Sequence, residues 1–528
     1  MTREAGVLLA ISSLPSREGI GTLGEGAYDF VRFLERAGFR VWQVLPLTPT
    51  REGNSPYSSV SATASNPLFI DLYDLAERGL LKKKEISFSP TDKVDYAALI
   101  PEKERLLRLA FSRFNIGNDG FCAFVDRGEY AEYAAFSTMS EAFGGKPFTE
   151  WEDGYDRCDR ERVSAFLRQH LEEYLYHLFT QYIFEEEWKK LKEFASAHHV
   201  KIFGDMPIYV AMNRAEAYVH PELFLFDEAR RPVKVAGVPP DYFNSEGQLW
   251  GNPLYDWEGM KKDGFSWWRD RIRRELKRFD ILRIDHFRGL DRFYAIDVDA
   301  EDAKHGVWMA GPGADLFEGM LDLPIVAEDL GYIDESLHRM LDAVGFPGMK
   351  VYEFGLNGDP WCEHKPANYK ENVVAYTGTH DNMPFRGALD ELDESGIATA
   401  TRDILVQATV LDVPLPAHLD IARKVGKGES ADRAKQSKVD YLESLPPSAF
   451  LGKRTDMLTK AAARSLLASK ARLAMMPMQD ILALGAESRM NTPALVSEDN
   501  WAWRLDKAAL TDSLAAELKK DLKKAKRA

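Results

Sequence analysis

The chain is poor in cysteine and lacks both long apolar runs and an excess of positive charge. Its three cysteines, Cys122, Cys158 and Cys362, form an odd set without metal-ligand spacing, which argues against a disulfide framework and fits a reducing cytoplasm. No stretch approaches the roughly 20 apolar residues of a membrane span, and the apolar run 6–11 is too short for the core of a signal peptide. We therefore predict a cytoplasmic protein that does not span a membrane.

The charge balance is acidic and excludes some classes of partner. The 68 basic and 83 acidic side chains give a formal net charge of -15, which repels nucleic acid and anionic membranes. We expect a partner that is neutral or cationic. The length of 528 residues allows one large decorated domain or two to three smaller ones.

Short apolar runs alternate with helical patterns along the chain, which favours an α/β fold. The runs lack the alternation of half-exposed strands, so they fit buried parallel strands. Eight such runs match the number of strands in a closed (β/α)8 TIM barrel. A doubly wound open sheet is the alternative, but no Gly-x-Gly-x-x-Gly sequence opens a helix. The expected strands are 7–10, 41–45, 201–205, 281–285, 324–328, 349–354, 373–377 and 471–476.

Three large insertions interrupt the alternation, at about 55–160, 209–264 and 389–469. The first is polar and aromatic, the second is rich in loop residues, and the third has mostly helical patterning. No internal repeat or low-complexity linker separates them from the rest. We therefore predict a single catalytic barrel domain over 1–528, with these subdomains inserted between strands and packed around the barrel.

Carboxylates directly follow three of the expected strands. Asp285 ends one run, Glu328 ends the next, and Asp381 follows the run 373–377. The carboxyl ends of parallel strands meet on one face of a barrel, where such enzymes carry out their chemistry. Two or three carboxyl groups in one cleft, without metal ligands around them, suit the transfer of a glycosidic bond. This pattern requires no metal and no organic cofactor.

The neighbours of these carboxylates predict different roles for them. Arg283 lies two residues before Asp285 and points to the same side of the strand, so it favours the ionised form that a nucleophile needs. Glu328 has no adjacent cation, and crowding by Asp285 and Asp381 would raise its proton affinity, which suits a general acid/base. Each acid alone could instead cap a turn or a helix, and the Arg283–Asp285 pair could be purely structural.

The strings around these residues resemble the signature regions of the α-amylase clan: Arg283-x-Asp285-His286, Glu328 and His380-Asp381. Their ordered set is similar to one branch, glycoside hydrolase family 77, the 4-α-glucanotransferases or amylomaltases. The similarity runs nearly from end to end. The other matching strings are 13–16, 19–21, 54–57, 64–67, 204–208, 238–243, 248–255, 479–480, 489–493 and 500–504.

The resemblance implies a retaining transfer between α-1,4-glucans or maltooligosaccharides. Asp285 would be the nucleophile that forms a covalent glycosyl intermediate, Glu328 the general acid/base, and Asp381 a third carboxylate that holds sugar hydroxyls. The glycosyl unit would pass to the 4-hydroxyl of an acceptor, under a lid formed by 239–243. The protein would be a monomer or a weak homodimer. The residues expected to bind substrate are Tyr57, Asp205, Tyr242, Phe243, Trp250, Asn252, Arg283 and His380.

Two other functions fit the same residues. One is a hydrolase of α-glucans with the same chemistry, and the other is a non-catalytic glucan-binding protein on a degenerate barrel. The sequence also departs from the family at Met383-Pro384, where Asp-Thr is usual, and in the poorly matching segment 389–469. Both departures flank the last barrel loops, so acceptor range and product size are not predicted.

Overall fold

Eight parallel strands form the central sheet, in the order β10-β11-β12-β1-β2-β3-β6-β9. The computed structural model describes residues 3–50, 52–240, 246–331 and 333–528. At the two edges of the sheet, the Ala327 amide donates a hydrogen bond of 3.0 Å to the Pro347 carbonyl, which closes the sheet into a (β/α)8 barrel. The strands are β1 (Glu4–Leu8), β2 (Val41–Gln43), β3 (Lys201–Met206), β6 (Ile281–Ile284), β9 (Ile325–Ala327), β10 (Gly348–Val351), β11 (Val373–Tyr376) and β12 (Leu473–Pro477).

The interior of the barrel is filled by side chains and is not a channel. One buried apolar cluster gathers residues from six of the eight strands. The phenol of Tyr376 donates to Gln43 Oε1 at 2.9 Å, so this buried hydroxyl has a partner inside the barrel. The buried members of the cluster are Val41, Phe203, Val326, Met349, Val351, Val374, Tyr376, Leu473 and Met475.

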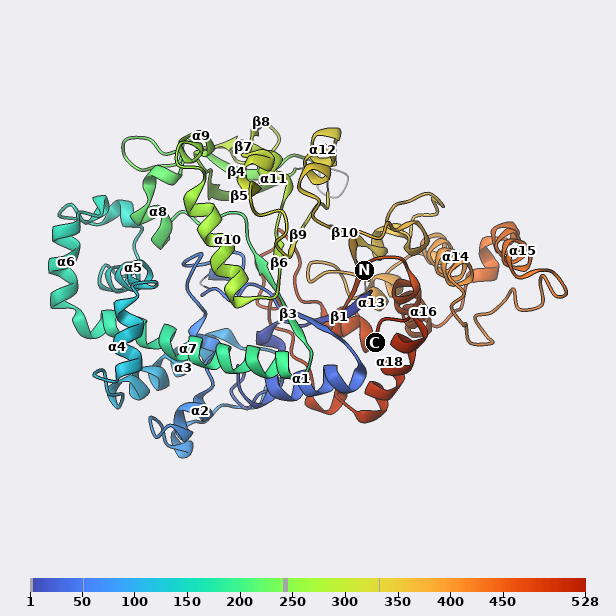
Figure 1. Ribbon diagram of the computed structural model, residues 1–528, viewed down its shortest axis with the longest axis horizontal. Coiled ribbons are helices and arrows are strands. Elements are labelled where there is room, and N and C mark those ends of the chain that lie inside the picture. The colour runs from blue at the N-terminus through green and yellow to red at the C-terminus, as the bar shows by residue number, and fades with distance from the viewer. Residues whose placement is uncertain (1–2, 51, 241–245, 332) are drawn as a thin grey trace.

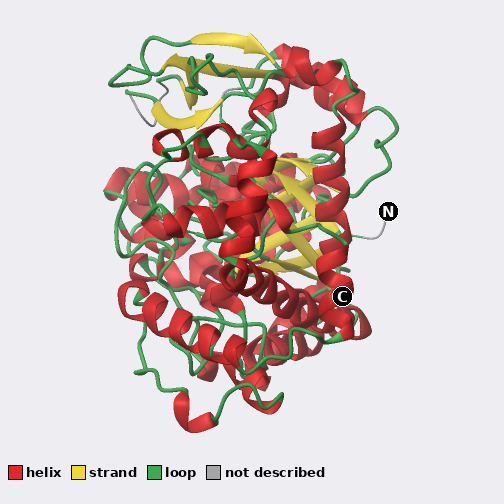
Figure 2. Ribbon diagram, turned by 90° about the vertical axis from the view of Figure 1, so that its left-hand side faces the viewer, coloured by secondary structure: helices red, strands yellow, loops and turns green. Residues whose placement is uncertain are grey.

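Helices surround the strands on the outside (Figures 1 and 2). In α1 (Glu25–Ala37) the apolar face is buried, and Gly38 ends the helix with φ 87° and an amide that bonds back to the Leu34 carbonyl. In α12 (Glu335–Val344) the Asp334 carboxylate caps the amide of Leu337. The further covering helices are α7 (Leu171–Ala197), α10 (Ser266–Arg278), α16 (Thr455–Ala468) and α18 (Asp512–Lys524), with the short α11 (Arg288–Asp291) and α17 (Met478–Ile481) at strand ends.

All eight expected strands are confirmed, with shifted ends. The first begins at Glu4 because Glu4 and Ala5 already pair with Leu473 and Ala474 of β12. The sixth stops at Val351, three residues earlier than expected, because the chain turns into the 3-10 helix Tyr352–Gly355. An apolar run therefore marks where a strand lies, while pairing with its neighbours sets where it ends.

The first insertion is largely helical. Its helices pack mainly against α7, and an aromatic cluster that includes Phe114, Phe121, Phe179 and Tyr182 fills the interface. The aromatic content of this stretch thus belongs to a helical core. The helices are α2 (Leu72–Glu77), α3 (Tyr96–Ser112), α4 (Asp119–Asp126) and α5 (Ala131–Ala142), and α6 (Arg160–Gln169) follows the insertion.

The second insertion keeps many loop residues, as expected, but it also contains short strands that its sequence does not predict. It contributes two strands to a four-stranded antiparallel sheet, β5-β4-β7-β8, seen beside the barrel in Figure 2. The strands are short, and β4 pairs with β7, which lies outside the insertion, so local patterning misses them. The bounds are β4 (Lys234–Val238), β5 (Gln248–Pro253), β7 (Arg292–Asp297) and β8 (Val307–Ala310), next to helices α8 (Ala215–Val219) and α9 (Trp257–Lys261).

The third insertion is helical, as expected, and extends to one side of the barrel (Figure 1). It has an apolar cluster of its own, built around Phe385, Ile404, Leu442 and Leu458. Within the described ranges, no helix has both the length and the apolar character needed to cross a membrane. Besides α16, its helices are α13 (Phe385–Asp390), α14 (Glu394–Val410) and α15 (Ala431–Ser444).

Candidate active site

The predicted residues lie at the carboxyl ends of the barrel strands. Asp205 is the fifth residue of β3 and pairs in register with Arg283 of β6. Asp285 and Glu328 come directly after β6 and β9, and Asp381 lies in the loop between β11 and α13. The closed barrel therefore brings these four residues, which are far apart in the sequence, to one rim.

Arg283 is the centre of a buried ionic network. Its Nη1 atom lies 2.7 Å from each carboxylate oxygen of Asp205, and its Nη2 atom lies 2.8 Å from Asp285 Oδ1. The hydroxyl of Tyr57 donates to Asp205 Oδ2 at 2.7 Å. The side chains of Arg283 and Asp205 are almost fully buried, whereas that of Asp285 remains 26% exposed. The network thus orients Asp285 toward open space, while both oxygens of Asp205 are occupied by protein groups.

Glu328 is held next to Asp285 by main-chain donors. Its Oε2 atom accepts a bond of 2.7 Å from the amide of His286, the residue that follows Asp285. Its Oε1 atom accepts a bond of 2.7 Å from the amide of Leu330. His286 has a positive φ of 47°, a conformation that is unfavourable for a non-glycine residue and is often found at functional sites. The strained turn after β6 therefore links the positions of both carboxylates.

Burial controls the proton affinity of this pair. It raises the pKa of Glu328 to about 7, an effect that Arg283 opposes and Asp285 reinforces. It raises the pKa of Asp285 to about 6, again against the attraction of Arg283 and with repulsion from Asp205 and Asp381. Glu328 is thus the more basic of the two, in the order that the sequence suggests, although burial rather than crowding is the main cause. Burial also lowers the pKa of His286 to about 4, so this neighbour is neutral.

Asp381 is the most exposed of the three carboxylates, with 45% of its side chain open. His380 Nε2 lies 3.4 Å from Asp381 Oδ2, and the imidazole stacks on the ring of Tyr57 with an interplanar angle of 9°. Asn491 donates from its side-chain amide to Asp381 Oδ1 at 2.7 Å. Tyr57 therefore joins both sides of the rim, through its hydroxyl to Asp205 and through its ring to His380.

The predicted aromatic and amide groups of the second insertion differ in their settings. Trp250 is 37% exposed, and its ring lies edge-on to that of His286 at 4.9 Å. Asn252 donates from its side-chain amide to the Val210 carbonyl at 3.0 Å, which braces β5 against the segment after β3. Tyr242 and Phe243, and with them most of the predicted lid, lie outside the described residues.

Sequence reasoning missed the support that Asp381 receives from the C-terminal part of the chain. Arg489 donates to the Asp381 carbonyl at 2.9 Å, next to the bond from Asn491. Trp501 lies within 6 Å of both Tyr57 and His380, ring centre to ring centre. The sequence offers one indication, because 489–493 and 500–504 belong to the strings that resemble the family. Their spacing along the chain does not show that they contact the loop of Asp381.

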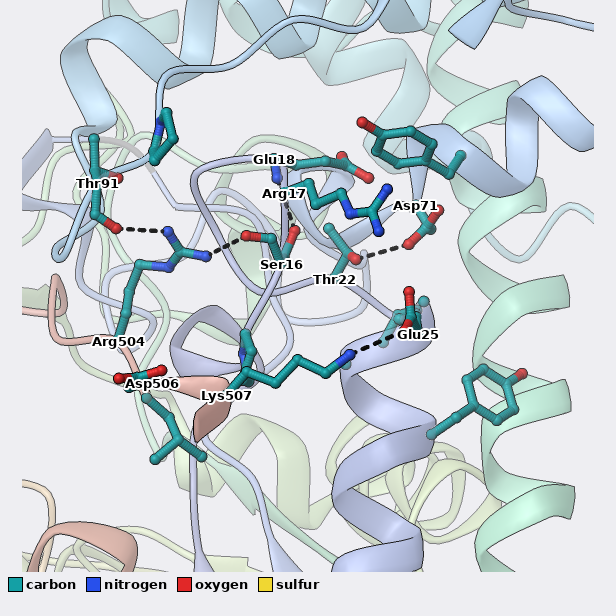
Figure 3. A pocket seen from close by; sticks show the side chains of 18 of the residues that line it. Ser16, Arg17, Glu18, Thr22, Glu25, Asp71, Thr91, Arg504, Asp506 and Lys507 are labelled. Carbon is teal, nitrogen blue, oxygen red and sulfur yellow. Dashed lines mark hydrogen bonds and ion pairs between the residues drawn. The ribbon is translucent and has the colours of Figure 1, made fainter. Parts of the chain in front are cut away.

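Two other features stand apart from this rim. A cavity of about 1170 Å³ lies beside the start of α1, and none of the predicted site residues line it. Figure 3 shows its lining tied together by its own contacts, such as Lys507 to Glu25 and Thr22 to Asp71. A possible metal-ligand group in the described chain joins Glu141 of α5 with Glu173 and His177 of α7, and Arg108 already pairs with both glutamates. Cavity size alone thus does not locate the site.

A closed barrel whose carboxyl-end rim holds an ion-paired aspartate beside a more basic glutamate belongs to the class of barrel enzymes that act on glycosidic bonds. Comparisons with known proteins identify the family within this class. The family model described as 4-alpha-glucanotransferase, glycoside hydrolase family 77, matches residues 9–511. The chain belongs to this family of enzymes.

Its relatives match over nearly their whole length. The chain is 38% identical to the 4-alpha-glucanotransferase of Thermus thermophilus, covering 98% of each protein. It is 36% identical to that of Clostridium butyricum, covering 96% of this chain and 97% of the relative. Among solved structures, the amylomaltase of Streptococcus agalactiae in complex with acarbose superposes with a TM-score of 0.86 at 36% identity, covering 99% of each chain. The resemblance inferred from the sequence is confirmed.

Proposed function

We propose that the chain is a retaining 4-α-glucanotransferase that moves α-1,4-linked glucan segments from a donor maltooligosaccharide to the 4-hydroxyl of an acceptor glucan or glucose. The observation that carries the proposal is the bond from the His286 amide to Glu328 Oε2, which holds an acid against the residue that follows an ion-paired aspartate. The names of the relatives and the oligosaccharide analogue acarbose in the streptococcal structure support the same substrate class.

The first half-reaction uses the two carboxyl groups in different protonation states. Glu328 protonates the glycosidic oxygen of the leaving chain while ionised Asp285 attacks the anomeric carbon. The carbon–oxygen bond breaks, and a covalent glycosyl–Asp285 ester forms. The pKa of about 7 for Glu328 keeps a protonated fraction available near neutrality, and the lower pKa of about 6 for Asp285 keeps most of the nucleophile ionised.

The second half-reaction reverses the proton transfer. Glu328, now a carboxylate, removes the proton from the 4-hydroxyl of the acceptor, and the resulting oxygen attacks the anomeric carbon. Asp285 leaves as a carboxylate, and the new α-1,4 bond has the configuration of the old one. A sugar hydroxyl must outcompete water at this step, so a bound acceptor has to be positioned over the ester.

The remaining rim residues bind and orient the sugar in this proposal. Asp381 and His380 hold hydroxyls of the sugar at the reacting carbon, and Tyr57 supports its ring. Arg283 orients Asp285, and Asp205 acts through Arg283 and Tyr57, because its oxygens are already occupied. Trp250 offers an exposed apolar face to a neighbouring glucose. Asn252, Tyr242 and Phe243 stay predicted substrate-binding residues.

Incubation of the purified protein with maltotriose tests transfer against hydrolysis. Transfer yields glucose together with a ladder of chains longer than the substrate, seen by chromatography of the products. Glucose and maltose without longer chains would instead identify an α-glucan hydrolase.

We extend the proposal to the organisation of the protein. The whole chain, 1–528, acts as one catalytic unit in the cytoplasm, as a monomer or weak homodimer, and without metal or organic cofactor. Ultracentrifugation of the protein tests the oligomeric state. Activity after treatment with a metal chelator tests the cofactor, because a loss restored by one divalent ion would contradict that part.

A further inference from the structure

Asp381 is more exposed than the other two carboxylates, which an ion pair and main-chain amides hold in place. Its own loop gives it only weak support, from the Thr379 hydroxyl, which accepts from the Asp381 amide at 3.3 Å, and from His380 at 3.4 Å. An exposed carboxylate with such long contacts can adopt several side-chain rotamers. A stable orientation therefore needs a stronger partner.

The stronger partners come from a segment about 110 positions further along the chain. Asn491 gives Asp381 Oδ1 its closest hydrogen bond, at 2.7 Å, and Arg489 binds the Asp381 carbonyl at 2.9 Å. Arg489 also donates from Nε to the Asn491 carbonyl at 2.7 Å, so one guanidinium fixes both residues relative to each other. Asn491 and Arg489 thus form a clamp that holds both the side chain and the main chain of Asp381.

The clamp is itself anchored. The Trp501 amide donates to the Met490 carbonyl at 2.7 Å, and the Thr492 amide donates to Asn500 Oδ1 at 3.0 Å. Only 9% of Asn491 is exposed, so its amide does not exchange freely with water. An amide is the suitable group at this position, because its NH2 donates to a carboxylate and carries no charge that would protonate or repel it.

We infer that Asn491 is a positioning residue, which holds Asp381 as an oriented acceptor for the hydroxyls of the sugar at the reacting carbon. The inference rests on the proposed function. Asn491 acts through Asp381, and Arg489 acts through Asn491. Since Asp381 binds the sugar most strongly when the transition state forms, loss of the clamp lowers kcat more than it raises KM.

Two substitutions separate this role from a general effect on folding. Asn491→Ala removes the donor, and we expect kcat to fall about 10- to 100-fold at every pH, the equivalent of one hydrogen bond to a charged group. Asn491→Asp places two carboxylates in contact, so one of them gains a proton at acid pH and can again donate to the other. The ratio of the activity of Asn491→Asp to that of the parent enzyme should therefore be close to one at low pH and should decline as the pH rises.

The matched control is Asn372→Asp. Asn372 precedes β11 at the opposite end from Asp381, and its side chain bonds the Gly345 carbonyl at 3.1 Å. The same change of amide to acid there should leave the ratio of activities independent of pH. Thermal unfolding of all three variants monitors folding, and if Asn491→Asp does not fold, Asn491→Ala alone decides.

An unchanged kcat in Asn491→Ala, or a loss in Asn491→Asp that is equal at all pH values, would overturn the positioning role. These failures are distinct from failure of the proposed function. If the parent enzyme makes no ladder from maltotriose, the proposed function is wrong, whereas normal ladders from both variants contradict only this inference.

Discussion

The two sides of the catalytic rim are held by different means. Asp285 and Glu328 follow adjacent strands and are fixed by Arg283 and by main-chain amides close to them. Asp381 lies in the exposed loop between β11 and α13 and is held by Asn491, which follows β12 in the chain. The strand-held side carries groups whose proton affinity is shifted by burial, while the loop-held side carries an accessible binding group. Under the proposed mechanism, bond making and sugar binding would therefore be supported by different contacts.

The largest expected effect is on the strand-held side. Asp285→Asn keeps the shape but removes the nucleophile, so we expect transfer to fall by about 10⁴-fold or more. Binding of maltooligosaccharides, measured by calorimetry, should persist. Asp270→Asn, on the exposed face of α10, is the matched control and should behave like the parent enzyme. Normal turnover by Asp285→Asn would show that another residue is the nucleophile. If Asp285→Asn also lost oligosaccharide binding, the two sides of the rim would not be independent.

Glu328→Gln should have the next largest effect. Loss of a general acid/base costs about 10²- to 10⁴-fold, and less with donors whose leaving group needs no proton. The measurement compares maltotriose with an activated glycosyl fluoride donor. Glu335→Gln, at an exposed position of α12, serves as the control. Equal losses with both donors would argue against proton transfer by Glu328.

The pH dependence of kcat/KM tests the order of the two pKa values. Activity should fall below about pH 6 as Asp285 gains a proton and above about pH 7 as Glu328 loses one, giving a bell-shaped profile. Glu328→Gln should lose the alkaline limb of the profile and keep the acid one. A profile that rises steadily through pH 8 would show that protonated Glu328 is not required.

Tyr57→Phe should have the smallest effect, because it removes only the link between the two sides. The ring can still stack on His380, but Asp205 loses the hydrogen bond from the phenol. We expect kcat/KM to fall about 3- to 30-fold, the equivalent of one hydrogen bond. Tyr441→Phe, on α15 of the third insertion, should leave kcat/KM unchanged. A loss of several hundredfold at 57 would mean that the two sides are not supported separately.

Much of the barrel and the strand-held side follow from the sequence for a physical reason. Parallel strands are covered on both faces, so they leave apolar runs such as Val373–Tyr376, and residues just after such runs must meet at one rim. The positions of Asp285, Glu328 and Arg283 at this rim therefore follow without coordinates. The same logic correctly places Asp381 but says nothing of what holds it.

The remainder depends on pairings that local pattern does not encode. The bond between Asn491 and Asp381 joins loops far apart in the chain, and Asn is common in turns without any partner. Strand β4 pairs with β5 and with the more distant β7, while its short glycine-containing sequence resembles a loop. The end of β10 at Val351 is likewise set by the turn that follows it.

The position of β12 between β1 and β11 has a consequence for how the enzyme is made. A nascent chain that has emerged only as far as the seventh strand has two uncovered edges, because β1 must wait for Leu473–Pro477 to arrive. The clamp on Asp381 follows still later. Catalytic competence is thus acquired all at once, near the end of translation, and a prematurely terminated product would have an open sheet that is prone to self-association.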